Sequence, residues 1–282
     1  MQNLSTTTTL PTLVIMCLSM LLSACGGGSD KENSSATLNG HYKPTANATW
    51  QWQLTGTINQ RYDVDIYDID LFDTDIETIT QIKAAGRHVI CYFSAGSYEP
   101  WRSDADQFSP SDLGYAMDGW PDERWLDIRS DNVADRMTAR LTLAVNKGCD
   151  GVEPDNVDGY TNDTGFSLTS ADQLAFNKRL ATEAHQLGLS IGLKNDLDQV
   201  SALVSYFDFA VNEQCSEYAE CDALLPFIEA NKPVLSAEYN SLYISDASAR
   251  SALCNTMNDR GFSTLILSED LDDSFRYSCQ TP

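Results

Sequence analysis

The segment GCDGVEPDNVDGY, residues 148–160, decides how the rest of this 282-residue chain is interpreted. Four carboxylates fall within nine residues, at the predicted end of a short buried strand: Asp150, Glu153, Asp155 and Asp158. A buried charge must be paired or neutralised, so a strand that ends in carboxylates is a poor way to fill a core. Such a strand end is a common place for general acid–base chemistry. The segment therefore indicates a functional site.

Short apolar runs alternate with helical patterns on both sides of this segment. The predicted strands cover residues 64–67, 88–93, 125–128, 151–153, 190–193, 207–212, 233–237 and 264–267. Helices are predicted over 75–85, 133–146 and 170–187, and each is followed by a glycine that can end it. About eight strand–helix units in roughly 230 residues indicate an α/β fold, a (β/α)8 barrel of the TIM type. A doubly wound sheet is the competing fold, but no glycine-rich phosphate loop follows the first strand.

The first residues have the pattern of a targeting signal. An apolar run over residues 13–22 is too short to span a bilayer comfortably. The sequence LSAC that follows, residues 22–25, has the form of a bacterial lipobox, in which a lipid is attached to the cysteine. Residues 1–24 contain no Lys or Arg, so an ordinary secretory signal is the alternative. We predict a lipoprotein signal peptide over 1–24, a lipid on Cys25, a flexible linker over 25–48 and one folded domain over 49–282.

This N-terminus and the charge of the chain set its surroundings. We predict an exported protein on a bacterial membrane, with the outer membrane favoured, that faces the periplasm or the cell surface. Nothing later is apolar enough to cross a membrane, so contact is predicted through the lipid only. With 18 basic and 41 acidic residues the formal net charge is −23, which excludes nucleic acid as a partner. Such acidity serves solubility or attracts a cationic ligand. We expect a monomer.

Six cysteines lie in the predicted folded domain, an even number that suggests disulfides in an exported protein. Cys215 and Cys221 are close enough to close a small loop, and Cys254 with Cys279 would pin the C-terminal tail. Cys91 lies in an apolar strand and is interpreted as a buried thiol. The chain has three histidines and no Cys-x-x-Cys pair. We therefore predict neither a metal site nor a cofactor.

Paired carboxylates at strand ends point to one kind of chemistry. A glycosidase needs two carboxylates across the scissile bond: one protonates the leaving oxygen, and the other attacks or activates water. Asp155 ends the fourth predicted strand and Glu213 ends the sixth, so in a barrel the two would face each other over the central mouth. Glu238, at the end of the seventh strand, is a third candidate.

Several stretches spread along the chain strengthen this interpretation. They are WQWQL (50–54), DIYDID (65–70), CYFSAGSYE (91–99), ERWLDI (123–128), residues 150–160, GLKND (192–196) and NEQC (212–215). In these stretches the chain resembles glycoside hydrolase family 114, the endo-α-1,4-polygalactosaminidase family, over about residues 50–270. The resemblance implies a TIM-type barrel that cleaves α-1,4-linked galactosamine or N-acetylgalactosamine within an exopolysaccharide of the biofilm kind. It maps the catalytic pair onto Asp155 and Glu213.

By analogy with α-retaining barrel glycosidases, Asp155 is assigned as nucleophile and Glu213 as general acid/base, with the reverse assignment left open. The residues that we predict to bind the sugar are Asp68, Tyr92, Ser94, Glu153, Asn156, Asp158, Lys194, Asn195, Glu238 and Tyr239. For Glu153, a hydrogen bond that holds the loops is an equal alternative. Two other classes stay open: a carbohydrate-binding barrel without catalysis, and a glycosidase for another α-linked sugar.

Overall fold

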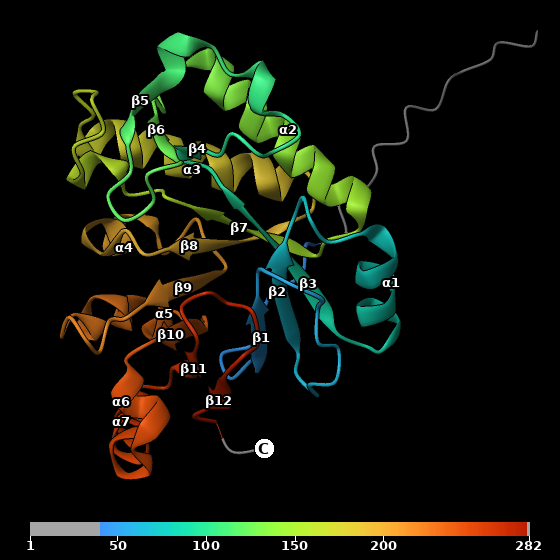
Figure 1. Ribbon diagram of the computed structural model, residues 1–282, viewed down its shortest axis with the longest axis vertical. Helices are drawn as coiled ribbons and strands as arrows, with labels where there is room; N and C mark the ends of the chain where they lie inside the picture. Colours follow the sequence, from blue (N-terminus) through green and yellow to red (C-terminus); the bar gives the residue numbers. More distant parts are fainter. Residues whose placement is uncertain (1–39, 281–282) are drawn as a thin grey trace, which may run out of the picture. The chain divides into compact units, whose positions relative to one another are not determined.

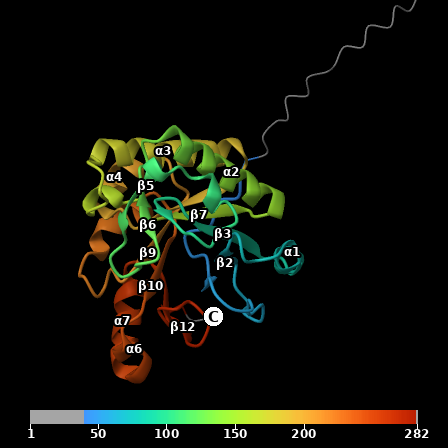
Figure 2. The ribbon, with the colours of Figure 1, turned by 45° about the horizontal axis from the view of Figure 1, so that its top comes forward.

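The structure is a computed structural model that describes residues 40–280 (Figures 1 and 2). The predicted signal peptide, Cys25 and most of the predicted linker lie outside the described residues. Among the described helices, none combines the length and the apolar composition that crossing a bilayer requires.

Eight parallel strands follow one another around the sheet in chain order. They are β1 (Trp50–Gln53), β2 (Ile66–Asp70), β3 (His88–Ser94), β7 (Gly151–Asp155), β8 (Ser190–Lys194), β9 (Phe209–Glu213), β10 (Val234–Glu238) and β11 (Ser263–Leu267). An antiparallel strand, β12 (Arg276–Ser278), pairs with β11. The Arg276 guanidinium donates to the Trp50 carbonyl at 2.8 Å, and the Trp50 indole donates to the Ser263 carbonyl at 2.9 Å. These bonds join β1 to the other edge of the sheet, as a barrel requires.

The eight barrel strands are not the eight that the sequence predicts. The prediction of a barrel strand over residues 125–128 is wrong, because β6 (Arg124–Leu126) pairs antiparallel with β4 (Ser97–Tyr98) and β5 (Leu113–Ala116) in a separate sheet. Both views place this small sheet on the same side of the domain as α2 and α3 (Figures 1 and 2). The missing strand is β1, which is buried along its whole length. The two errors cancel, so Asp155 and Glu213 do lie on the fourth and sixth barrel strands.

Helices surround the outside of the strands (Figure 1). The α-helices are α1 (Ile76–Ala84), α2 (Asp131–Lys147), α3 (Ser170–Gln186), α4 (Val200–Leu203), α5 (Leu225–Glu229), α6 (Ser241–Ser245) and α7 (Ala247–Asp259). The three predicted helices have recognisable caps. The Asp75 carboxylate accepts from the Thr78 backbone N–H at the start of α1, and Thr169 and Asp172 form a capping box at the start of α3. Gly148 ends α2 in the left-handed conformation, with φ of 89°.

The barrel core has two apolar layers because side chains of a strand alternate between its two faces. In β9, Phe209 and Val211 belong to the cluster inside the barrel with Trp50, whereas Ala210 belongs to the cluster between strands and helices. Gly192 of β8 leaves room for the Phe209 ring, since a Cβ there would lie 2.4 Å from the ring.

Residues 41–48, predicted as the end of the flexible linker, pack against the domain. The His41 ring lies 2.9 Å from an Asp208 oxygen, and the Tyr42 ring stacks on His88 with centroids 3.6 Å apart. Asp208 directly precedes β9 and His88 begins β3, so the chain enters at the N-terminal ends of the barrel strands. The predicted boundary at residue 49 is therefore too late.

Three disulfides join the six described cysteines. Cys215–Cys221 and Cys254–Cys279 form as predicted. The interpretation of Cys91 as a buried thiol is wrong, because Cys91 is bonded to Cys149 with a Cα–Cα distance of 6.1 Å. The two residues are 58 positions apart in sequence and become neighbours only because β3 pairs with β7.

Candidate active site

Three charged side chains meet at the carboxyl ends of β7, β8 and β9. The Lys194 ammonium lies 3.0 Å from Asp155 Oδ1 and 3.0 Å from Glu213 Oε2. The two carboxylate oxygens are therefore no more than about 6 Å apart, twice that distance. The side chains of Asp155 and Glu213 are 18% and 29% exposed, whereas that of Lys194 is 2% exposed. Two partly exposed carboxylates thus share one buried cation.

Hydrogen bonds fix the orientation of both carboxylates. The Tyr92 hydroxyl donates to Asp155 Oδ2 at 2.9 Å, and the Asn156 backbone N–H donates to Asp155 Oδ1 at 2.7 Å. The Tyr239 hydroxyl donates to Glu213 Oε1 at 2.6 Å. With Lys194, Asp155 receives three donors and Glu213 two among the described contacts.

The residue after each of these strands turns the chain sharply. Asn156, Asn195 and Gln214 have φ of 59°, 48° and 59°, a conformation that is costly for residues other than glycine. The Asn195 side-chain oxygen accepts from the Glu213 backbone N–H at 3.1 Å, which ties β8 to β9. The turns hold the last residue of each strand at the barrel rim.

A close backbone approach supports the end of β7. The backbone N–H groups of Ala95 and Gly96 donate to the Asp155 carbonyl at 2.8 and 3.1 Å. A Cβ on Gly96 would lie only 1.7 Å from the Asn156 carbonyl oxygen. Only glycine fits at this position without displacing Asp155.

A layer of buried carboxyl groups lies beneath the catalytic candidates. Asp68 and Glu153 are fully buried, and Glu153 Oε1 is 3.3 Å from the Lys194 ammonium. Burial raises the pKa of Asp68 to about 7. Burial and the charge of Asp68 raise the pKa of Glu153 well above its ordinary value. Burial opposes the charge on Lys194, but Asp155, Glu213 and Glu153 outweigh it and raise its pKa well above the ordinary value. At neutral pH Lys194 is therefore charged.

A cleft of about 1040 Å³ opens at these strand ends. Six predicted sugar-binding residues line it: Tyr92, Asn156, Asp158, Lys194, Asn195 and Tyr239. The other four are completely buried and do not belong to the described lining: Asp68, Ser94, Glu153 and Glu238. These four residues therefore support the cleft wall from behind, and their direct contact with sugar stays a prediction.

Two of these supporting contacts are explicit. Ser94 Oγ accepts from the Asn156 side chain at 2.8 Å and so helps to hold the turn after β7. Glu238 accepts from the Ser216 backbone N–H at 2.8 Å, and burial raises its pKa to about 7.

The sequence did not single out several cleft residues. Glu123 accepts from Ser97 Oγ at 2.5 Å, and burial raises its pKa to about 7. Burial and the charge of Asp158 raise the pKa of Asp196 to about 8. Trp120, 59% exposed, also lines the cleft. Glu123 and Trp120 come from the insert between β3 and α2. The ERWLDI stretch could have pointed to Glu123, but its residues 125–128 were assigned to a barrel strand instead.

The cleft is strongly acidic. Of the described residues that line it, fourteen carry carboxyl groups and two, Arg102 and Lys194, carry a cation. Arg102 is itself bound by Asp70 and Glu99, each at 2.7 Å. Both cations are thus already paired, and the remaining carboxyl groups give the wall its charge.

A parallel barrel that presents two carboxylates across an open cleft has the features of a glycoside hydrolase. The family model described as glycoside-hydrolase family GH114 matches residues 31–282, so the chain belongs to that family. The predicted family and the enzyme class are confirmed.

Solved structures agree with this assignment. The crystal structure of Aspergillus fumigatus Ega3 in complex with galactosamine is 45% identical, with a TM-score of 0.81, over 85% of this chain and 98% of that chain. The glycoside hydrolase domain of PelA from Pseudomonas aeruginosa is 12% identical, with a TM-score of 0.64, over 83% of this chain and 98% of that chain. The latter similarity shows the fold alone and agrees with the predicted barrel. A search among curated proteins returns no match.

Proposed function

We propose that this protein is an endo-acting glycosidase that cleaves α-1,4-linked galactosamine polymers, whether fully or partly deacetylated. The observation that carries the proposal is the acidic cleft of a chain 45% identical to a structure that contains galactosamine. Deacetylated galactosamine bears an ammonium group, which a wall of carboxylates attracts. The cleft volume of about 1040 Å³ lies at the upper end of small-molecule pockets, as internal cleavage of a polymer requires.

The spacing of the two carboxylates supports a retaining mechanism. A separation of at most about 6 Å between facing oxygens of Asp155 and Glu213 fits the ~5–5.5 Å of retaining enzymes better than the ~6.5–9.5 Å of inverting ones. Asp155, with three donors, serves as the nucleophile. Its oxygen bonds to the anomeric carbon while Glu213 gives its proton to the glycosidic oxygen, and the bond between that oxygen and the anomeric carbon breaks.

The second half of the reaction reverses these roles. Glu213, now a carboxylate, removes a proton from a water molecule whose oxygen attacks the anomeric carbon. The ester bond to Asp155 breaks, and the sugar leaves with its original α configuration. Lys194 and Tyr92 stabilise the Asp155 carboxylate as it is released.

We further propose that the enzyme is exported as a monomer and tethered by a lipid on Cys25 to a bacterial membrane, the outer membrane being favoured. The lipobox sequence supports the tether. The three disulfides support an oxidising compartment, the periplasm or the cell surface. Mass spectrometry of the N-terminal peptide tests the lipid, and an unmodified Cys25 would exclude it.

The test of the activity is a digest of defined galactosamine and N-acetylgalactosamine oligomers, α-1,4-linked and partly or fully deacetylated. The wild-type protein should release internal fragments, and Asp155→Asn and Glu213→Gln should not. Asp150→Asn is the matched control, because Asp150 lies at the other end of β7, where it pairs with Lys83 and does not line the cleft. Nuclear magnetic resonance of the first product should show the α anomer.

Two outcomes would replace the proposal. Binding of the polymer without turnover, unchanged by Asp155→Asn, would make the protein a carbohydrate-binding barrel. Turnover of a different α-linked sugar, with none on galactosamine oligomers, would keep the chemistry and change the substrate.

A further inference from the structure

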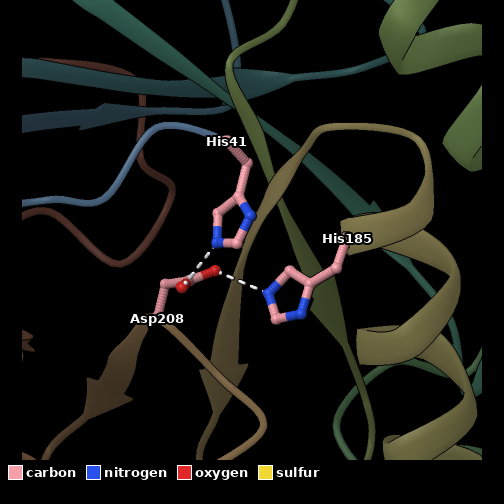
Figure 3. Close-up of side chains that lie close together, drawn as sticks. All are labelled: His41, His185 and Asp208. Carbon is pink, nitrogen blue, oxygen red and sulfur yellow. Dashed lines mark hydrogen bonds and ion pairs between the residues drawn. The ribbon is translucent and has the colours of Figure 1, made fainter. Parts of the chain in front are cut away.

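A second cluster of titratable side chains lies at the opposite end of the barrel from the cleft. Asp208 directly precedes β9, and His185 is in the last turn of α3. His41 belongs to the segment through which the chain enters the domain. Figure 3 shows both imidazoles directed at the one carboxylate. The residues are separated by 23 and 144 positions in sequence, so only folding brings them together.

The ligating atoms of the three residues converge. His41 Nε2 lies 2.9 Å from Asp208 Oδ1, and His185 Nε2 lies 2.9 Å from Asp208 Oδ2 (Figure 3). The two rings stack with centroids 4.2 Å apart and an angle of 11° between their planes. One ligating atom from each residue lies within 4.8 Å of the others.

Two imidazole nitrogens and one carboxylate are a typical protein ligand set for zinc. Zinc binds each at about 2.0–2.2 Å, so ligands around a tetrahedral ion lie roughly 3–3.5 Å apart. The 2.9 Å nitrogen–oxygen distances are close to this spacing. The stacked rings direct their nitrogen lone pairs along nearly parallel planes, so one imidazole must turn out of the stack before both nitrogens bind the same ion. Two hydrogen bonds to Asp208 are the competing explanation. They need a proton on each Nε2, whereas a metal needs the lone pair there.

We propose that His41, His185 and Asp208 form a zinc site that fastens the N-terminal segment to the base of the barrel. The ion has three protein ligands, and water completes the tetrahedron. A cavity of about 700 Å³ beside the cluster gives that water room. The site is structural rather than catalytic, because it lies at the N-terminal ends of the strands, whereas Asp155 and Glu213 end theirs.

Charged groups around the cluster affect how tightly it would bind zinc. Lys43 and Lys232 also line the cavity, and each repels a cation. The Lys232 ammonium donates to the backbone carbonyls of Val204 and Phe207 at 2.6 and 2.5 Å. The net charge of −23 on the whole chain acts in the opposite direction and favours cation binding.

The test is zinc titration of the full chain, purified without a polyhistidine tag, in excess magnesium to suppress weak binding to the acidic cleft. Calorimetry and native mass spectrometry should give one zinc ion per chain. At zinc about 100-fold above the dissociation constant, Tm should rise by about 5–10 °C. His41→Asn and His185→Gln keep a hydrogen-bond donor for Asp208 but are poor zinc ligands. Each should weaken zinc binding by more than about 100-fold, beyond the usual cost of losing an outer-sphere partner.

His88→Gln is the matched control. It alters the remaining histidine, which stacks on Tyr42 of the same segment but is not part of the cluster, and it should bind zinc as the wild type does. Absence of saturable zinc binding in the wild type, with no rise of Tm, would leave hydrogen bonds as the whole explanation and overturn the proposal. Zinc binding that survives both His41→Asn and His185→Gln would also overturn it, by placing the ion elsewhere.

Discussion

Replacing Lys194 by methionine should lower the free energy of unfolding by about 3 kcal/mol. The Lys194 ammonium is buried and lies 3.0 Å from the oxygens of both Asp155 and Glu213. At an effective dielectric constant of about 20, the ion pair between Lys194 and Asp155 is worth about 5.5 kcal/mol before desolvation. Desolvation offsets much of this, and breaking a buried ion pair from one side costs about 3–5 kcal/mol in measured cases. The 18% and 29% exposure of the carboxylates favours the lower end of that range.

Denaturant and thermal unfolding would measure the effect. For a domain of this size, about 3 kcal/mol corresponds to a Tm lower by about 6–12 °C. A double-mutant cycle with Asp155→Asn is the sharper measurement. In the wild type, Asp155→Asn removes a favourable contact with Lys194 and destabilises. In Lys194→Met this contact is already lost, so the same change should destabilise less.

The coupling energy between Lys194→Met and Asp155→Asn tests whether Lys194 holds the two carboxylates. A coupling energy of about 1–3 kcal/mol is expected for residues in direct contact. If Asp155→Asn has the same effect in both backgrounds, Lys194 does not hold the two carboxylates and the reasoning is refuted. Lys83→Met is the control background, because Lys83 pairs with Asp150 at the other end of β7 and is 37% exposed. There Asp155→Asn should be additive.

Three further predictions concern other parts of the domain. Burial raises the pKa of Glu238 to about 7, so the contribution of Glu238 to stability is present below about pH 4.5 and is lost as the pH rises towards 7. Glu238→Gln should therefore raise Tm at about pH 8 and leave it unchanged at about pH 4. Parallel profiles of Tm against pH for the variant and the wild type would contradict this. Gly96→Ala should lower kcat by about 100-fold, because its Cβ would displace the Asn156 carbonyl and the end of β7; unchanged kcat with normal folding would refute it. Replacing both Cys91 and Cys149 by alanine removes a disulfide that closes a loop of 58 residues, so the free energy of unfolding should fall by about 4 kcal/mol. Denaturant unfolding measures this, and a fall below about 1 kcal/mol would count against a stabilising role.

The barrel could be predicted from the sequence, but one strand was assigned to the wrong segment. β1 reads WQWQ, an apolar–polar alternation of only four residues, and its two glutamines are buried as fully as its two tryptophans, so this short stretch does not have the apolar run of the other barrel strands. The stretch around Trp125 has a clearer apolar run, yet it pairs with β4 and β5 outside the barrel. The local sequence pattern indicates that a segment is extended, but it does not indicate which sheet the segment joins.

Asp155 and Glu213 could be predicted because each is the last residue of its strand. How deeply a carboxyl group is buried along its strand could not be predicted from the sequence in the same way. Glu153 is two positions before Asp155, so alternation points both in the same direction but leaves Glu153 one layer lower, fully buried. The cluster of His41, His185 and Asp208 was missed because zinc motifs are recognised by short spacings, which these residues lack.

Lys194 also balances charge through the proposed reaction. The Lys194 ammonium lies 3.0 Å from an oxygen of Asp155 and 3.0 Å from an oxygen of Glu213, so both carboxyl groups share it. Before the first step Asp155 is the anion and Glu213 holds the proton; in the glycosyl-enzyme the Asp155 charge is lost in the ester and Glu213 is the anion. One negative charge therefore lies 3.0 Å from the same cation in both states.

This symmetry predicts that Lys194→Met slows formation and hydrolysis of the glycosyl-enzyme together. Mass spectrometry of the acid-quenched enzyme during turnover should then detect no more of the intermediate in the variant than in the wild type. A marked accumulation would show that Lys194 assists hydrolysis selectively, and the cation would belong to Glu213 alone.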